Sequence, residues 1–210
     1  MKTVALEGDF PVVCIGGASA NIDDYTELIR KLAPDPGIAI VIINHLSLVN
    51  DLLIEALPCC TEMLVDLITD GMPVQPNHIY ISPDERDLHL LNGKFCLKPI
   101  SKPTGWPDVI SVFLRSLAAN WRGQIIAVIY AGYDGDGAAA LCSVKQAGGI
   151  TIAQRTEIAG QPDMPLSAIA SGYVDFILSI EGIAREIERA ARAAKAEVVD
   201  GNEEPGFLPG

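Results

Sequence analysis

The sequence predicts an α/β fold with three layers (αβα): a doubly wound, mostly parallel sheet with an antiparallel hairpin at one edge. Two observations predict the sheet. Uninterrupted apolar runs of strand length recur along the chain, and helical patterns alternate with them. Apolar strands of this kind are buried on both faces, as in parallel sheets covered by helices. A third observation, the dipeptide Asn92-Gly93 between apolar segments, predicts the hairpin.

The strands are expected where β-branched and other apolar residues follow one another. These segments are 11–16, 38–44, 63–68, 78–82, 124–130, 150–153 and 174–178. The hairpin spans 88–98, and its Asn92-Gly93 pair suits the positive backbone dihedrals of a type I′ turn.

Helices are expected where apolar residues recur at intervals of three and four. These segments are 22–32, 49–57, 109–119, 138–147, 166–170 and 183–196. Asn21 is placed to cap the first helix, and Asp23 and Asp24 suit the dipole of its first turn. The pair Gly148-Gly149 ends the helix at 138–147.

One domain over 11–196 accounts for this pattern, because 210 residues suffice for one well-packed core and neither a repeat nor a linker interrupts it. Residues 1–10 are an N-terminal extension with no basic segment ahead of an apolar one, so we expect no signal peptide. The tail 197–210 is acidic and rich in Gly and Pro, and we expect it to be disordered.

The charge of the chain argues against several classes of partner. With a net charge of -12 and a pI near 4.5, it repels phosphate backbones and anionic lipid, so we expect no nucleic-acid partner and no direct membrane insertion. No apolar run is long enough to span a bilayer. The five cysteines are irregularly spaced without a C-x-x-C pair, which favours reduced, mostly buried thiols in a cytoplasmic protein.

Polar residues of catalytic type follow three of the expected strands. Ser19 comes after the first strand, His45 after the second, and the acids Asp134 and Asp136 after 124–130. The carboxyl ends of parallel strands share one edge of the sheet, where ligands bind. A serine, a histidine and an acid there are what a nucleophilic hydrolase requires. Taken singly, each has a simpler structural interpretation as a cap, a hydrogen-bonded core residue or a turn acid.

Competing motifs fit less well. The glycines at 16–17 do not form G-x-G-x-x-G, and no Walker A sequence occurs. The loop 134–137 has alternating Asp and Gly as in a calcium loop, but Ala138 and Lys145 stand where oxygen ligands are needed. The chain order Ser, His, Asp differs from that of α/β-hydrolases, and Asn21 replaces the second glycine of a nucleophile elbow.

Several segments together resemble the catalytic domain of the chemotaxis-receptor methylesterase (CheB-type) family. Segment 15–19 is similar to the family's I-G-A-S, 42–46 to its Q-H motif, and 132–137 to its G-M-G-x-D-G loop. Further matches are at 70–74 (D-G-x-P), 77–83 (x-Y-x-A-P), 147–149 (A-G-G), 153–154 (A-Q) and 163–168 (G-M-P-x-x-A). They cover nearly the whole chain in the family's order.

The resemblance implies a serine esterase with Ser19 as nucleophile, His45 as base and Asp136, not Asp134, as catalytic acid. It places the backbone N–H of Tyr133 at the oxyanion and Ala20 and Met164 along the site. It implies hydrolysis of glutamate γ-methyl esters on cytoplasmic helices of methyl-accepting chemoreceptors, and deamidation of receptor glutamine, with no cofactor or metal. The family's receiver domain does not match this sequence, so a stand-alone catalytic domain is expected.

Three departures from the family leave alternatives open. Ala20-Asn21-Ile22 replaces Thr-Gly-Gly, Asp134 replaces a glycine, and 109–111 replaces Ser-Val-Asp. A carboxylate at Asp134 would oppose a nearby oxyanion, or would be a surface turn acid without effect. One alternative is a catalytically weak domain that binds a signalling partner; another is an esterase for small esters, which would show an enclosed apolar pocket.

Overall fold

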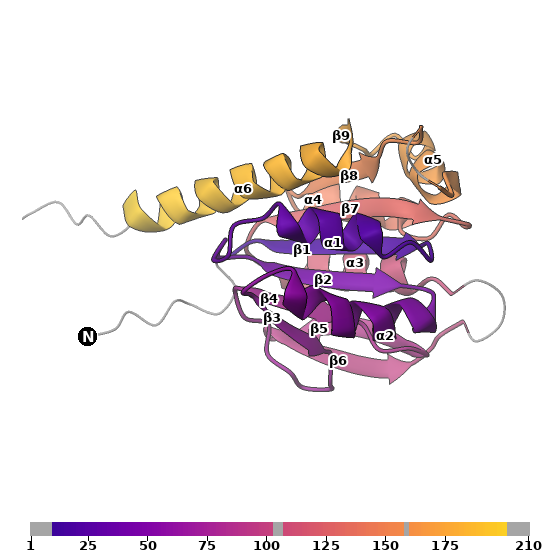
Figure 1. Cartoon of the computed structure of the whole chain (residues 1–210), viewed down its shortest axis with the longest axis horizontal. Coiled ribbons are helices and arrows are strands. Elements are labelled where there is room, and N and C mark those ends of the chain that lie inside the picture. Colours follow the sequence, from indigo (N-terminus) through magenta and orange to yellow (C-terminus); the bar gives the residue numbers. More distant parts are fainter. Residues whose placement is uncertain (1–9, 103–106, 158–159, 201–210) are drawn as a thin grey trace, which may run out of the picture.

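Seven parallel strands form the central sheet of the computed structural model, which describes residues 10–102, 107–157 and 160–200. The strand order is β3-β4-β2-β1-β7-β8-β9 (Figure 1). The strands are β1 Val12–Ala18, β2 Ala39–Asn44, β3 Leu64–Leu67, β4 His78–Ile81, β7 Ile125–Gly132, β8 Ile150–Gln154 and β9 Phe176–Leu178. The predicted α/β fold with a mostly parallel sheet is confirmed.

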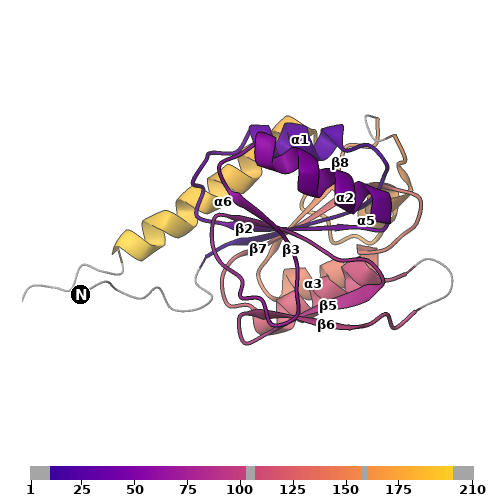
Figure 2. The same ribbon diagram turned by 60° about the horizontal axis from the view of Figure 1, so that its bottom comes forward.

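Helices cover both faces of this sheet. The helices are α1 Asp23–Arg30, α2 Ser47–Ala56, α3 Val109–Asn120, α4 Leu141–Gln146, α5 Asp163–Ala170 and α6 Ile180–Asp200, with short 3-10 turns η1 Leu57–Cys59 and η2 Ala138–Ala140. Helices α1, α2 and α6 pack on one face, while α3, α4 and α5 pack on the other (Figure 2). The arrangement is therefore three layers.

The alternation of side chains along the strands explains why both faces are buried. Every residue of β1, β2 and β7 is buried, and successive side chains point to opposite faces. In β1, Val12 and Cys14 join the core under α3 and α4, whereas Val13 and Ile15 join the core under α1 and α6. A strand that is buried on both faces is apolar at nearly every position, because neither face contacts water. This is why the sequences of these strands are unbroken apolar runs.

The predicted hairpin is present as a two-stranded antiparallel sheet of its own, β5 Arg86–Leu91 and β6 Lys94–Pro99. Its turn has φ of 51° at Asn92 and 71° at Gly93, as a type I′ turn requires. Rather than extending an edge of the main sheet, the hairpin lies beside α3 (Figure 2). Its Phe95 packs near Phe113 of α3, with 6.4 Å between the ring centroids.

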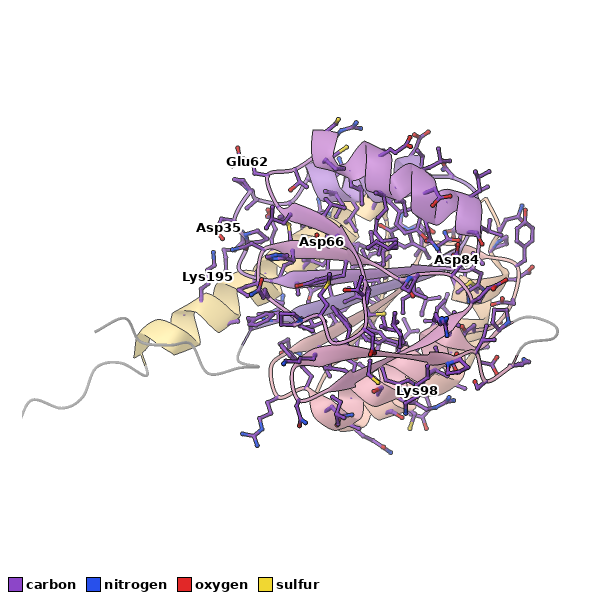
Figure 3. The ribbon with its side chains drawn as sticks, turned by 90° about the horizontal axis from the view of Figure 1, so that it is seen from below. Asp35, Glu62, Asp66, Asp84, Lys98 and Lys195 are labelled. Carbon is purple, nitrogen blue, oxygen red and sulfur yellow. The ribbon has the colours of Figure 1, made fainter. Side chains whose placement is uncertain are left out.

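The ends of the chain differ in detail from the sequence-based prediction. Helix α6 continues to Asp200, beyond the expected end at 196. At its far end Lys195 donates a hydrogen bond over 2.7 Å to the carbonyl oxygen of Asp35, in the loop before β2 (Figure 3). The predicted N-terminal extension up to residue 9 and the predicted disorder of 201–210 lie outside the described residues.

All five cysteines are free thiols, but the expectation that most are buried is wrong. Only Cys14, on the central strand, is buried; Cys59 is exposed and the remaining three are half-buried. Their positions outside the central strands explain this exposure. Within the part of the chain that the structure describes, none of the helices has the length and apolar character needed to cross a bilayer.

The sheet reverses its winding direction between β1 and β7. From β1 the chain builds one side of the sheet with β2, β3 and β4, and it later returns to β7 on the other side of β1. Helices diverge to opposite faces at such a point, which leaves a crevice at the carboxyl ends of the two strands. The loops after β1 and β7 therefore face each other across the crevice.

Candidate active site

Three neighbouring strands bring Ser19, His45 and Asp136 to the same edge of the sheet. The register pairs Gly17 with Asn44, so Ser19 and His45 leave adjacent strand ends. The backbone N–H of His45 donates to the carbonyl oxygen of Gly17 over 3.2 Å and extends this pairing by one residue. On the other side of β1, Ala18 pairs with Gly132, which begins the loop that carries Asp136.

Asp136 accepts a hydrogen bond from His45. The distance from Nε2 of His45 to Oδ2 of Asp136 is 3.0 Å, and the side chains are 1% and 2% exposed. This is the predicted contact between the histidine and its acid. The proximity of a carboxylate orients the ring and stabilises an imidazolium, which is the role of the acid in a Ser-His-Asp site.

The start of α3 holds the Asp136 carboxylate in place. Its oxygens accept backbone N–H groups from Ile110 at 2.8 Å, Ser111 at 2.9 Å and Gly137 at 2.7 Å. Burial raises the pKa of the Asp136 carboxyl, but hydrogen bonds from His45, Ser111 and Ile110 outweigh burial and hold its pKa below the usual value. A helix N-terminus offers unpaired N–H groups and a positive dipole end, so it keeps this acid ionised.

A second carboxylate reaches the other nitrogen of the same ring. Oδ2 of Asp134 lies 2.9 Å from Nδ1 of His45, within ion-pair distance but away from the line of a straight hydrogen bond. The other oxygen of Asp134 accepts the backbone N–H of Asp136 over 2.8 Å. The Asp134 side chain is 9% exposed, so the expectation of a surface turn acid is wrong. The turn directs this carboxylate inward to the histidine.

The two acids set the charge of His45. Burial by itself lowers the pKa of His45, but the hydrogen bonds and charges of Asp134 and Asp136 outweigh it and raise the pKa to about 9. Both Asp134 and Asp136 contribute to this increase. In this arrangement His45 is an imidazolium at neutral pH.

Ser19 is buried, and Asn44 holds its backbone. The side-chain amide of Asn44 donates to the carbonyl oxygen of Ser19 and to the hydroxyl of Tyr25, each over 3.1 Å. The Ser19 hydroxyl accepts the backbone N–H of Asn21 over 3.2 Å. A serine nucleophile and its base are expected within hydrogen-bond reach. Among the described residues no hydrogen bond joins Ser19 to His45, because both nitrogens of the ring face carboxylates.

The remaining predicted site residues lie around the same edge. Ala20 is exposed in the loop after β1, and Tyr133 is 49% exposed in the loop after β7. Met164 of α5 is fully buried, with its sulfur against Gly132, where even a Cβ atom would collide with it. Met164 thus packs against Gly132, at the start of the loop that carries Asp134 and Asp136.

A cavity of about 300 Å³ opens on the α3 side of the two acids. Both basic and acidic side chains line it: Lys102, Asp108, Arg115, Asp134 and Asp136. Within the described ranges, no group of three or more His, Cys, Asp or Glu side chains is arranged to hold a metal ion.

Sequence reasoning singled out Asp134 but not its contact with His45, and it missed the contributions of Asn44 and the start of α3. The replacement of Ser-Val-Asp at 109–111 was a signal that this segment belongs to the site, although not that its backbone holds the acid. Asn44 immediately precedes His45 in the motif, and the available signal was a polar residue at the end of an otherwise apolar strand segment.

Comparison with known proteins gives one consistent result. A family model described as CheB methylesterase matches residues 13–187. A protein-glutamate methylesterase/protein-glutamine glutaminase of Rhizobium meliloti is 30% identical over 86% of this chain and 52% of its own length. One from Rhizobium johnstonii is 32% identical over 84% of this chain and 49% of its own length. This chain thus spans about half the length of these relatives.

A solved structure has the same fold. The crystal structure of the Thermotoga maritima CheB methylesterase catalytic domain superposes with a TM-score of 0.78 and 27% sequence identity. The match covers 86% of this chain and 98% of that catalytic domain. This chain therefore matches that catalytic domain over nearly the whole length of the domain.

Proposed function

The chain belongs to the CheB methylesterase family, and from this premise we propose that it hydrolyses γ-methyl esters of glutamate side chains by a Ser-His-Asp mechanism. Ser19 is the nucleophile, His45 the general base and Asp136 the acid that orients His45. The printed names of the relatives include protein-glutamine glutaminase. The same chemistry on a glutamine side chain releases ammonia in place of methanol.

The single observation that carries this proposal is the contact between His45 and Asp136. A buried carboxylate that three backbone N–H groups already hold ionised lies 3.0 Å from the histidine ring. The same edge of the sheet carries Ser19 at the end of the adjacent strand. This combination supports the proposal, because an acid held ionised beside a histidine orients the ring and stabilises an imidazolium.

The reaction proceeds in two steps. The Ser19 oxygen forms a bond to the γ-carbonyl carbon while His45 takes the hydroxyl proton; the carbonyl re-forms, methoxide leaves with that proton as methanol, and an acyl-serine remains. Water then attacks the acyl-serine with His45 again as base, and glutamate and free Ser19 result. The backbone N–H of Tyr133 is our candidate for the donor that stabilises the oxyanion in both steps.

The substrate is expected to be a methylated chemoreceptor, which this domain meets in the cytoplasm on the receptor's cytoplasmic helices. Ala20 and Tyr133, which follow the paired ends of β1 and β7, are exposed, so a protein surface can contact this edge of the sheet.

The test is methanol release from methylated receptor fragments. We expect release by the wild type, measured at pH 9 or above, where at least half of the His45 side chains are neutral, and no release above background by Ser19→Ala. Ser143→Ala is the control, since it makes the same change on α4, outside the catalytic loops. Equal release by the wild type and Ser19→Ala would exclude Ser19 as the nucleophile. The absence of release by the wild type across the pH range would exclude this activity.

A further inference from the structure

His45 has no nitrogen left for Ser19. Nε2 faces Asp136 at 3.0 Å and Nδ1 faces Asp134 at 2.9 Å. The assignment of the ring does not depend on hydrogen positions, because a half-turn of the ring would place carbon atoms against both carboxylates. Two carboxylates at the two nitrogens favour the doubly protonated ring, and in that form neither nitrogen has the lone pair with which a general base accepts a proton.

We propose that Asp134 is an autoinhibitory latch, which occupies the His45 nitrogen that Ser19 requires and keeps the esterase inactive until its side chain moves away. This inference rests on the proposed function, and it adds how the same site is regulated. It differs from the effect expected from sequence, in which Asp134 would have opposed the oxyanion directly.

The contacts of the two acids identify Asp134 as the one that moves. Asp136 accepts three backbone N–H groups in addition to His45, and two of them come from the start of α3. The Oδ2 atom of Asp134 has only its off-line contact with His45 among the described residues. Release of Asp134 therefore breaks one ion pair and one turn hydrogen bond, whereas release of Asp136 would disrupt the start of α3.

A cavity next to Asp134 can accommodate its side chain after release from His45. Asp134 and Gly135 both line the cavity of about 300 Å³ beside α3, and Arg115 and Lys102 line it as well. Arg115 forms no ion pair with the described residues, while Lys102 pairs with Asp108 at 3.2 Å. A rotation of Asp134 into this cavity replaces its ion pair with His45 by one with Arg115 or Lys102. The same rotation frees Nδ1 of His45. Asp136 then remains on Nε2, and His45 becomes the neutral base.

The charged groups around His45 set the expected pH dependence. Asp134 and Asp136, both from the loop after β7, are the described charges that act on the ring, and they raise the pKa of His45 to about 9. The neighbouring cavity adds Lys102, Arg115 and Asp108. At pH 7 a base with this pKa is about 1% neutral, whereas one near the ordinary value of 6.5 is mostly neutral.

The first measurement observes His45 without any substrate. We would follow its imidazole nitrogens by NMR in the full chain and in Asp134→Asn, which retains an oxygen for the N–H of Asp136. We expect both nitrogens of the wild type to be protonated at pH 7, and the titration midpoint of Asp134→Asn to fall by at least one pH unit. Asp163→Asn, an equal charge change on an exposed residue of α5, should leave the midpoint unchanged.

The second measurement observes the reactivity of Ser19. A fluorophosphonate forms a phosphorus–oxygen bond with an activated serine and expels fluoride, and its rate reports how readily His45 accepts the proton. We expect phosphonylation of Asp134→Asn to be on the order of 10- to 100-fold faster than that of the wild type at pH 7, and nearly equal at pH 9.5. Asp134→Gly, the residue usual in the family, serves if Asp134→Asn does not fold, and Ser19→Ala gives the background.

The outcomes separate the latch from the proposed function. A wild-type His45 that is neutral at pH 7, a midpoint that Asp134→Asn leaves in place, or a midpoint that falls without faster phosphonylation would each overturn the latch. Faster phosphonylation without methanol release by any variant would support the latch and overturn methyl-ester hydrolysis. Faster phosphonylation together with methanol release that rises at pH 7 supports both.

Discussion

The side-chain amide of Asn44 donates a hydrogen bond to the backbone carbonyl oxygen of Ser19 over 3.1 Å. The same amide group bonds the Tyr25 hydroxyl, and its oxygen accepts the N–H of Leu46 over 2.8 Å. Asn44 thus ties the loop of the candidate nucleophile to the turn that carries His45. It does so from the end of a buried strand, where an unpaired polar group would be costly.

Replacement of Asn44 is expected to weaken both loops. Asn44→Ala leaves the carbonyl of Ser19, the hydroxyl of Tyr25 and the N–H of Leu46 without this partner, and we expect the free energy of unfolding to fall by about 2–3 kcal/mol. Urea denaturation measures it. Asn120→Ala is the control, because Asn120 is exposed at the end of α3 with one local bond, and its loss should cost less than about 0.5 kcal/mol. Equal effects of the two changes would refute this role of Asn44.

Removal of the charge at Asp136 should affect stability and catalysis together. In Asp136→Asn, the amide nitrogen must face either His45 or backbone N–H groups, which are all donors, so we expect a loss of about 2–4 kcal/mol in the free energy of unfolding. We expect any esterase activity to fall by about 10³–10⁴-fold, since the ring loses the acid that orients it. Activity measured on protein shown by circular dichroism to be folded would contradict the assignment if it stayed near that of the wild type.

The raised pKa of His45 predicts how stability changes with alkaline pH. The folded protein binds the His45 proton up to about pH 9, whereas the unfolded chain releases it near 6.5. The stabilisation is therefore fully present below pH 6.5 and disappears as pH rises through 9, by an amount on the order of 3 kcal/mol. We would compare urea unfolding at pH 6 and pH 9.5 for the wild type and His45→Asn. The wild type should lose more stability than the variant, and parallel losses would contradict the prediction.

Close packing at Gly132 predicts that even a methyl group is not tolerated there. A Cβ atom would collide with the Met164 sulfur and would lie 2.9 Å from the Cβ of Ala18, on a buried strand. We expect Gly132→Ala to lower the free energy of unfolding by about 1–3 kcal/mol. At Gly160 nothing lies within 4 Å, so Gly160→Ala should be neutral or slightly stabilising. Thermal unfolding of both variants tests the contrast, which equal melting temperatures would refute.

The local pattern of the sequence determined the elements and the edge at which the candidate site lies. Unbroken apolar runs such as 38–44 predict strands buried on both faces, and parallel strands necessarily present their following loops at one edge. For that reason the strand pattern groups Ser19 and His45 with the acids Asp134 and Asp136, and the family resemblance selects Asp136. The Asn92-Gly93 turn was likewise predictable, because few residue pairs adopt its positive dihedrals.

Only the tertiary structure decided how the groups at that edge are paired. Asp134 and Asp136 are two residues apart in a glycine-rich turn, and no periodicity indicates which carboxylate turns inward; packing directs both to His45. Two of the three backbone N–H groups that hold Asp136 come from α3, about 25 residues away, where residue type does not reveal a main-chain donor. The hairpin has a predictable turn, but its apolar face packs against α3, and its strands do not extend an edge of the main sheet. Local geometry follows from the sequence, whereas contacts between distant segments depend on how those segments pack in three dimensions.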